Sequence, residues 1–240
     1  MGGLVAKKDE VQQKKKVIFC IPTITRPFQV CLDSLEASVP LIEAAGWEHG
    51  IAHSIGCPYI SHARAQMLRK AQDALASAIV FIDHDMSWRP QDLLKLIETE
   101  GDCVSGAYRF KDDQPESYMG ALLPGIDERP QVRADGAIKA HCVPAGFLKV
   151  TRMGVSRFML AYPELCYIDN ATLTVDLFNH GVHKGVWYGE DYAFSRNWLQ
   201  MGGEIWVVPD MQLDHHSADG RVWKGNFHEY LMRQPGGSKA

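Results

Sequence analysis

No segment of the sequence is apolar over the roughly 20 residues that a membrane-spanning helix requires. The apolar stretch 17–24 is much shorter and contains Pro22. An excess of positive charge is also missing, because 25 Lys and Arg stand against 29 Asp and Glu, a formal net charge of −4. The chain therefore offers no broad cationic surface to a nucleic acid backbone. From these absences we expect a cytoplasmic protein with no transmembrane segment and no nucleic acid partner.

The sequence also lacks closely paired cysteines. Its six cysteines include no Cys-x-x-Cys pair, a spacing typical of zinc sites and redox motifs. With 240 residues, 46% of them hydrophobic, the chain has the composition of a folded protein, and a domain of this size buries roughly 70% of its unfolded surface. We expect a flexible charged tail over 1–16, a single domain over 17–230 and a second flexible tail over 231–240. The oligomeric state stays open, a homo-oligomer included.

Short apolar runs alternate with segments that carry apolar residues at helical spacing. This alternation predicts an α/β fold with a mainly parallel, Rossmann-like sheet and helices on both faces. Between residues 109 and 133 the chain is polar and rich in Pro and Gly, and a turn pattern at 134–137 precedes the segment 138–143, which together predict a small antiparallel excursion. The expected strands are 17–21, 78–82, 103–108 and 205–208, and the expected helices are 28–45 (kinked or split at Pro40), 61–75, 90–97, 151–159 and 190–201.

Two aspartates, Asp83 and Asp85, follow the apolar run 78–82 with one residue between them. Ligands of parallel sheets bind at the carboxyl ends of strands, and alternate residues of a strand point to the same side. Both carboxylates can therefore reach one divalent cation, or a cation and a ribose hydroxyl, because such ions prefer oxygen ligands. The alternative is that either aspartate only caps the next helix or closes a turn.

A second candidate segment lies where the helix 190–201 is expected to begin. Glu190 and Asp191 occupy its first turn, where the helix dipole favours acidic residues and where both also can face a cleft. The preceding Trp187 and Tyr188 offer aromatic faces on which a sugar can stack. Routine helix capping is the alternative interpretation of the acidic pair.

A third segment, late in the chain, contains adjacent histidines. Either His215 or His216 can complete a metal site with Asp85, and we prefer His216. A mixed set of oxygen and imidazole ligands suits Mn²⁺ better than Mg²⁺. Lys224, in the basic and aromatic segment that follows, is a candidate partner for a departing diphosphate. Surface histidines and a solvated basic loop are the alternatives.

Together, Asp-x-Asp at 83–85, Gly-Glu-Asp at 189–191 and the late histidine resemble glycosyltransferases of the GT-A fold, especially the family-2-type and Anp1-like enzymes, over residues 17–224. The resemblance implies transfer of a sugar from a UDP- or GDP-type nucleotide sugar to a hydroxyl of a carbohydrate acceptor, with Mn²⁺ or Mg²⁺ as cofactor. The implied site residues are Pro22, Thr23, Thr25, Arg64, Asp83, His84 and Lys224 for the nucleotide sugar, Asp83, Asp85 and His216 for the metal, Asp191 and Glu190 for catalysis, and Gly146, Trp187 and Tyr188 for the acceptor.

Several alternatives stay open at this level. An inverting enzyme would use Asp191 as general base, whereas in a retaining enzyme the donor phosphate accepts the proton and the acidic pair positions the acceptor. A sugar nucleotidyltransferase would share the sheet and the carboxylates, but its phosphate loop is Gly-rich and residues 21–27 contain no glycine. A non-catalytic carbohydrate-binding module would keep Trp187 and Tyr188 without needing a metal-bound diphosphate.

Overall fold

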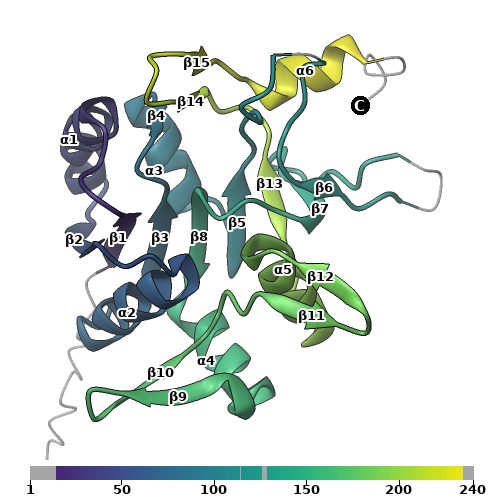
Figure 1. Ribbon diagram of the computed structural model, residues 1–240. Helices are drawn as coiled ribbons and strands as arrows, with labels where there is room; N and C mark the ends of the chain where they lie inside the picture. The colour runs from purple at the N-terminus through teal and green to yellow at the C-terminus, as the bar shows by residue number, and fades with distance from the viewer. Residues whose placement is uncertain (1–14, 114, 126–128, 235–240) are drawn as a thin grey trace, which may run out of the picture.

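The computed structural model describes residues 15–113, 115–125 and 129–234 (Figure 1). Its centre is an eight-stranded sheet with the strand order β2-β1-β3-β8-β5-β13-β7-β6. Most of the two predicted tails lies outside the described residues. The strands of this sheet are β1 (Lys16–Thr23), β2 (Glu48–Ile55), β3 (Ala78–Ile82), β5 (Cys103–Gly106), β6 (Ala121–Leu122), β7 (Ile138–Cys142), β8 (Phe147–Thr151) and β13 (Trp206–Val208).

Most strands of the sheet run in the same direction, as predicted, although several neighbouring pairs are antiparallel. β1 pairs in parallel with β2 and with β3, and β5 pairs in parallel with β13. β7 is antiparallel to β13 and to β6, which confirms the antiparallel excursion. β8 was not predicted in its role: it runs antiparallel between β3 and β5 in the middle of the sheet. An apolar run carries no sign of its direction, so the sequence pattern alone does not reveal this reversal.

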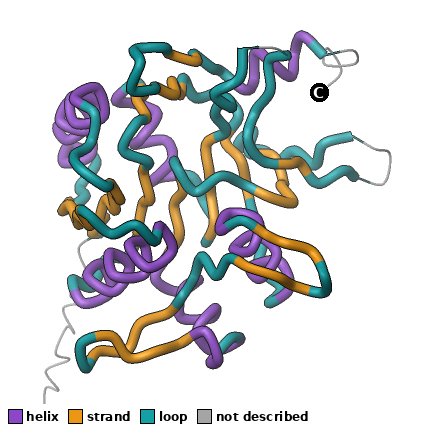
Figure 2. Tube along the Cα trace, in the orientation of Figure 1, coloured by secondary structure: helices purple, strands orange, loops and turns teal. Residues whose placement is uncertain are grey.

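Helices cover both faces of the sheet, as expected for this alternation (Figure 2). On one face α1 (Gln29–Ala44) and α3 (Pro90–Glu98) pack on the strands through side chains such as Leu35 and Leu93. On the other face α2 (Ile60–Asp73), α4 (Arg152–Ala161) and α5 (Glu190–Gln200) do so, for example through Met67 and Trp198. Pro40 lies inside α1 without splitting it.

Smaller elements lie outside the central sheet. β4 (Met86–Trp88), β14 (Leu213–His216) and β15 (Val222–Trp223) form a three-stranded sheet. Two hairpins, β9 (Cys166–Asp169) with β10 (Thr172–Val175) and β11 (Gly181–His183) with β12 (Val186–Tyr188), lie in the chain between a short 3₁₀ helix (Pro163–Leu165) and α5. The sequence pattern missed these strands and β2, because each is very short or half exposed.

The C-terminal end of the described chain is more ordered than predicted. Helix α6 (Phe227–Arg233) begins at Asn226, whose side chain accepts a hydrogen bond from Glu229 N at 3.1 Å. Phe227 is buried, and Leu231 packs against the core. The predicted tail over 231–240 therefore begins with three helical residues. Among the described residues, no helix combines the length and the apolar character that a membrane span needs.

Truncation of Phe81 in β3 tests the packing that holds the site-bearing strand. Phe81 is fully buried, with its ring 4.9 Å from the ring of Phe178. We expect Phe81→Ala to lower the free energy of unfolding by about 3–5 kcal/mol, since it removes an aromatic side chain and leaves a cavity. Leu160→Ala is the matched control, because Leu160 is 83% exposed and its loss should change stability by less than about 0.5 kcal/mol. Chemical denaturation of both variants measures the difference, and similar values for the two would contradict the assigned core.

Candidate functional site

The site begins at the carboxyl end of β3. All five residues of this strand are buried, and Asp83 and Asp85 follow it directly. Asp83 N donates a hydrogen bond to the carbonyl of Gly146, just before β8, at 2.9 Å. Because β1, β3 and β5 run in one direction, the residues that follow each of them meet at this edge of the sheet.

Arg64 of α2 lies at the centre of the site. Its guanidinium is only 2% exposed and contacts three carboxylates. Nη2 lies 2.9 Å from Asp83 Oδ1, and Nη1 lies 3.3 Å from Glu190 Oε1 and 3.6 Å from Asp191 Oδ1. The guanidinium also lies over the ring of Phe178, 5.0 Å from its centroid. The sequence analysis selected Arg64 and its three acidic partners from three separate segments, and the structure brings them into contact.

Arg64 remains charged in this setting. Burial alone would lower its pKa, but Asp83, Asp191 and Glu190 outweigh that effect and raise the pKa above its ordinary value. A buried guanidinium with several carboxylate partners satisfies the rule that buried charges are paired. It also fixes where the three carboxylates lie relative to one another.

The pKa of the Asp191 carboxyl group lies well above the ordinary value for aspartate. Burial raises its pKa to about 7, while Arg64 lowers it and the negative charges of Glu190 and Asp83 raise it further. The side chain of Asp191 is 17% exposed, so it faces the site and not open solvent. A carboxyl group with a pKa near 7 can exchange a proton at physiological pH, as a general base or acid must.

Tyr108 and Gly146 complete the surroundings of Asp83. The hydroxyl of Tyr108 donates to Asp83 Oδ2 at 3.3 Å and accepts from Gly146 N at 3.1 Å. Burial raises the pKa of Tyr108 well above its usual value, so the hydroxyl keeps its proton. A Cβ at position 146 would lie 2.2 Å from the Tyr108 hydroxyl oxygen and 2.4 Å from Asp83 Oδ2. Gly146 is therefore needed for the close approach of Asp83 and Tyr108; its predicted contact with an acceptor stays a prediction.

Asp85 faces a different set of partners from Asp83. Lys111, in the segment after β5, donates a hydrogen bond from Nζ to Asp85 Oδ2. His215 Nε2 lies 3.7 Å from the same oxygen. Burial raises the pKa of Asp85, but His215 and the hydrogen bond from Lys111 outweigh it, and the pKa lies well below its ordinary value. Asp85 is therefore an ionised carboxylate beside an imidazole and an ammonium group.

The structure distinguishes the two histidines that the sequence left open. β14 pairs with β4 so that His215 lies opposite Met86, the residue after Asp85. Side chains alternate along a strand, so only one of the two imidazoles can point toward Asp85. It is His215, whereas His216 Nε2 lies 2.7 Å from the hydroxyl oxygen of Ser87. The imidazole beside Asp85 therefore belongs to His215 and not to His216, the residue that we preferred from the sequence.

The tautomer of His215 follows from its other nitrogen. Nδ1 lies 2.9 Å from the carbonyl oxygen of Arg109, which can only accept a hydrogen bond. Nδ1 therefore carries the proton, and in the neutral ring Nε2 turns a lone pair toward Asp85. Among the described residues, no group of three or more His, Cys, Asp or Glu side chains is arranged to hold a metal ion. Asp85 and His215 together offer two ligand atoms.

The remaining predicted residues differ in burial and contacts. Pro22 and Thr23 are buried at the end of β1, whereas Thr25 is exposed in the loop that follows. That loop reaches His84, since Phe28 N donates to the carbonyl of His84 at 2.9 Å. Trp187 is 67% exposed, Tyr188 lies under the guanidinium of Arg196, and Lys224 is exposed beyond β15. The structure thus leaves the predicted roles of these residues as predictions.

Sequence reasoning missed Tyr108 and Lys111. Tyr108 stands two residues beyond the end of β5, and the rule that ligands bind at strand ends was the one signal that pointed to it. Lys111 lies in an irregular segment where no periodic pattern distinguishes one charged residue from another. Both were identifiable only after β5 had been placed two strands away from β3.

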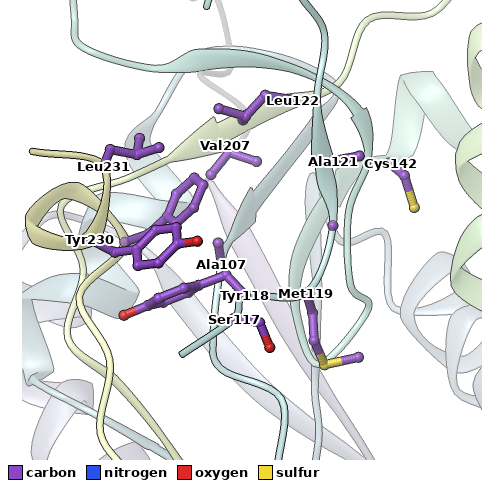
Figure 3. A pocket seen from close by; sticks show the side chains of 12 residues that line it. Ala107, Ser117, Tyr118, Met119, Ala121, Leu122, Cys142, Val207, Tyr230 and Leu231 are labelled. Atoms are coloured by element: carbon purple, nitrogen blue, oxygen red, sulfur yellow. The ribbon is translucent and has the colours of Figure 1, made fainter. Parts of the chain in front are cut away.

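Two cavities lie beside the site. The first, about 260 Å³, is lined by Ala107 and by aromatic side chains of α6 and the preceding loops; Tyr118 and Tyr230 lie side by side in it (Figure 3). The second, about 300 Å³, is polar and borders the start of α2. Ser61, one of its lining residues, is one helical turn before Arg64. The other residues that line the polar cavity are His62, Glu164, Leu165, Tyr167, Asp176 and Asn179.

Comparisons with known proteins give limited information. No protein-family model matches the sequence, and no curated protein matches it. Solved structures that resemble the chain include A197 from STIV, with 15% identity over 88% of this chain and 94% of that chain at a TM-score of 0.46. Another is S. aureus TarS 1-349, with 11% identity over 90% of this chain and 63% of that chain at a TM-score of 0.43. Similarities this low carry no argument about function, so function is argued from the geometry of the site.

The contact between Gly146, Asp83 and Tyr108 gives a test of the site geometry. In Gly146→Ala the new methyl group would collide with both side chains, so we expect Asp83 to move and the free energy of unfolding to fall by about 1–3 kcal/mol. Gly189→Ala is the matched control, because its Cβ meets open space and its φ of −64° suits alanine. Thermal unfolding of the two variants provides the comparison, and equal stability would show that Asp83 and Tyr108 do not crowd Gly146.

Proposed function

We propose that this protein is a metal-dependent glycosyltransferase that moves a sugar from a nucleoside-diphosphate sugar to a hydroxyl group of a carbohydrate acceptor. One observation carries the proposal. The carboxyl edge of one sheet carries both an ionised Asp85 beside the imidazole of His215 and, on Arg64, the carboxyl group of Asp191, whose pKa is raised to about 7. The first pair suits a metal-bound diphosphate and the second group suits proton removal from an acceptor.

The residues around Asp85 fit a divalent cation. Asp85 Oδ2 and His215 Nε2 are both electron-pair donors, and their separation of 3.7 Å leaves room for an ion that binds both. A carboxylate and an imidazole favour Mn²⁺ over ions that take oxygen ligands only. A metal held by these two residues would supply Lewis-acid stabilisation to a departing diphosphate.

Asp83 is suited to orient the donor. Its carboxylate is fixed by Arg64 and Tyr108, yet its side chain remains 28% exposed. A carboxylate oxygen can accept further hydrogen bonds in addition to those two. We therefore assign Asp83 to a hydroxyl of the ribose or of the sugar, and Asp85 to the metal. Fixing such a group in advance reduces the ordering that substrate binding has to supply.

Asp191 is suited to activate the acceptor. As the acceptor oxygen bonds to the anomeric carbon and the bond to the diphosphate breaks, the carboxylate takes the hydroxyl proton. Glu190, also on Arg64, is 30% exposed and can position the same acceptor. This description applies to an inverting enzyme; in a retaining one the acidic pair would position the acceptor only. The polar cavity next to α2 offers space for further sugar units.

Nucleoside diphosphate binding is the direct test. We expect one of UDP, GDP, CDP or TDP to raise the thermal unfolding midpoint in the presence of Mn²⁺, since a ligand at about 100 times its Kd adds roughly 2.7 kcal/mol. Asp85→Ala should lose this stabilisation. Asp73→Ala, which removes an exposed carboxylate paired with Arg69, is the control and should keep it. If no nucleotide stabilises the parent with or without metal, a non-catalytic carbohydrate-binding protein becomes the better interpretation.

The raised pKa of Asp191 predicts the pH dependence of turnover. A general base acts when ionised, so hydrolysis of the nucleotide sugar should rise with pH below about 7 and level off above it. Asp191→Asn should abolish this rise and lower the rate by about 10²–10⁴-fold. Glu190→Gln removes a neighbouring negative charge and should move the midpoint to lower pH. Initial rates of nucleoside diphosphate release measure all three, and a flat profile for the parent would rule out Asp191 as the base.

A further inference from the structure

Asp85 already has a cationic partner of its own. The ammonium group of Lys111 donates to Oδ2, the same oxygen that lies 3.7 Å from His215 Nε2. The pair is partly shielded, since the side chain of Asp85 is 13% exposed and that of Lys111 is 32% exposed. Lys111 therefore binds the carboxylate oxygen that the proposed metal would also need.

The surroundings of Asp85 favour a positive charge at Oδ2 whether or not metal is present. When the His215 ring is neutral, its Nε2 lone pair lies 3.7 Å from Asp85 Oδ2, and a positive group at this oxygen relieves the repulsion between the two electron-pair donors. A shielded carboxylate without a partner is also costly. Lys111 meets both needs with a single charge on a flexible stem. A divalent cation bonded to Oδ2 would repel the ammonium group, so the two cations exclude each other at that oxygen.

A hydrogen bond and an ion pair hold the segment that follows Lys111 in the chain. Asp113 Oδ1 accepts a hydrogen bond from Trp223 Nε1 at 3.1 Å. Glu116 pairs with Arg233 of α6 at 2.8 Å. A lysine displaced from Asp85 can therefore move by rotation of its side chain while the segment stays in place. A diphosphate at this site would offer the displaced ammonium group a new anion.

We propose that Lys111 is a resident counter-ion of Asp85, which the metal displaces, and that the displaced ammonium group then binds the diphosphate of the donor. The second step rests on the proposed function. Metal alone should bind weakly, because it must expel Lys111 into solvent. Metal and nucleoside diphosphate should strengthen each other, because the diphosphate gives the expelled ammonium group a partner. Such coupling is reciprocal, so each ligand raises the affinity of the other by the same factor.

Binding of Mn²⁺ alone tests the displacement. The free-ion EPR signal is titrated with the parent, with Lys111→Met, which keeps the length of the side chain without its charge, and with Asp85→Ala. We expect Lys111→Met to bind Mn²⁺ about tenfold more tightly than the parent, and Asp85→Ala to lose binding. Lys139→Met is the matched control, because Lys139 pairs with Glu204 and should leave Mn²⁺ affinity unchanged. Equal or weaker Mn²⁺ binding by Lys111→Met would overturn the proposal.

A second titration tests the transfer to the diphosphate. At saturating Mn²⁺, calorimetry with UDP and GDP should show about tenfold weaker nucleotide binding in Lys111→Met than in the parent and in Lys139→Met. Unchanged nucleotide affinity would overturn this step. If neither nucleotide binds the parent, the proposed function fails, whereas tighter binding of Mn²⁺ alone by Lys111→Met would still identify Lys111 as the resident cation. The two failures are therefore distinguishable.

Discussion

The buried guanidinium of Arg64 is the interaction on which the site depends. A charge that is only 2% exposed must be paired, and its partners come from the end of β3 and the first turn of α5. These elements are far apart in the sequence, and their packing on one face of the sheet brings the three carboxylates together. The acidic start of α5 thus faces a cation inside the molecule, although such residues usually only cap a helix.

The two aspartates of one short motif have separate environments because of this arrangement. Asp83 is fixed by Arg64 and by the hydroxyl of Tyr108, whereas Asp85 faces Lys111 and His215. Each carboxylate is compensated by a different cation, so the negative charge of the motif is divided before any ligand binds. This division is the structural basis of the proposal that Asp83 orients the donor and that Asp85 holds a metal.

The small three-stranded sheet is the second determinant of the site. β4 begins directly after Asp85, and its register with β14 places His215 opposite Met86. A shift of one residue would turn the imidazole of His215 away and present His216 in its place. Tyr108 contributes as well, since its ring lies edge-on to His215 at 5.1 Å while its hydroxyl binds Asp83. One buried tyrosine therefore links the two halves of the site.

The sequence by itself determined the alternation of strands and helices, the position of Asp83 and Asp85 at a strand end, and the acidic first turn of α5. These features are local, because hydrophobic periodicity and turn residues act over a few positions. Only the tertiary structure decided the direction of β8 and which of the two histidines lies beside Asp85. It alone also showed that Tyr108 contacts Asp83 and that Lys111 contacts Asp85. Each of these depends on strand register or on contacts between distant segments, and such contacts are set by packing and not by any pattern within one segment.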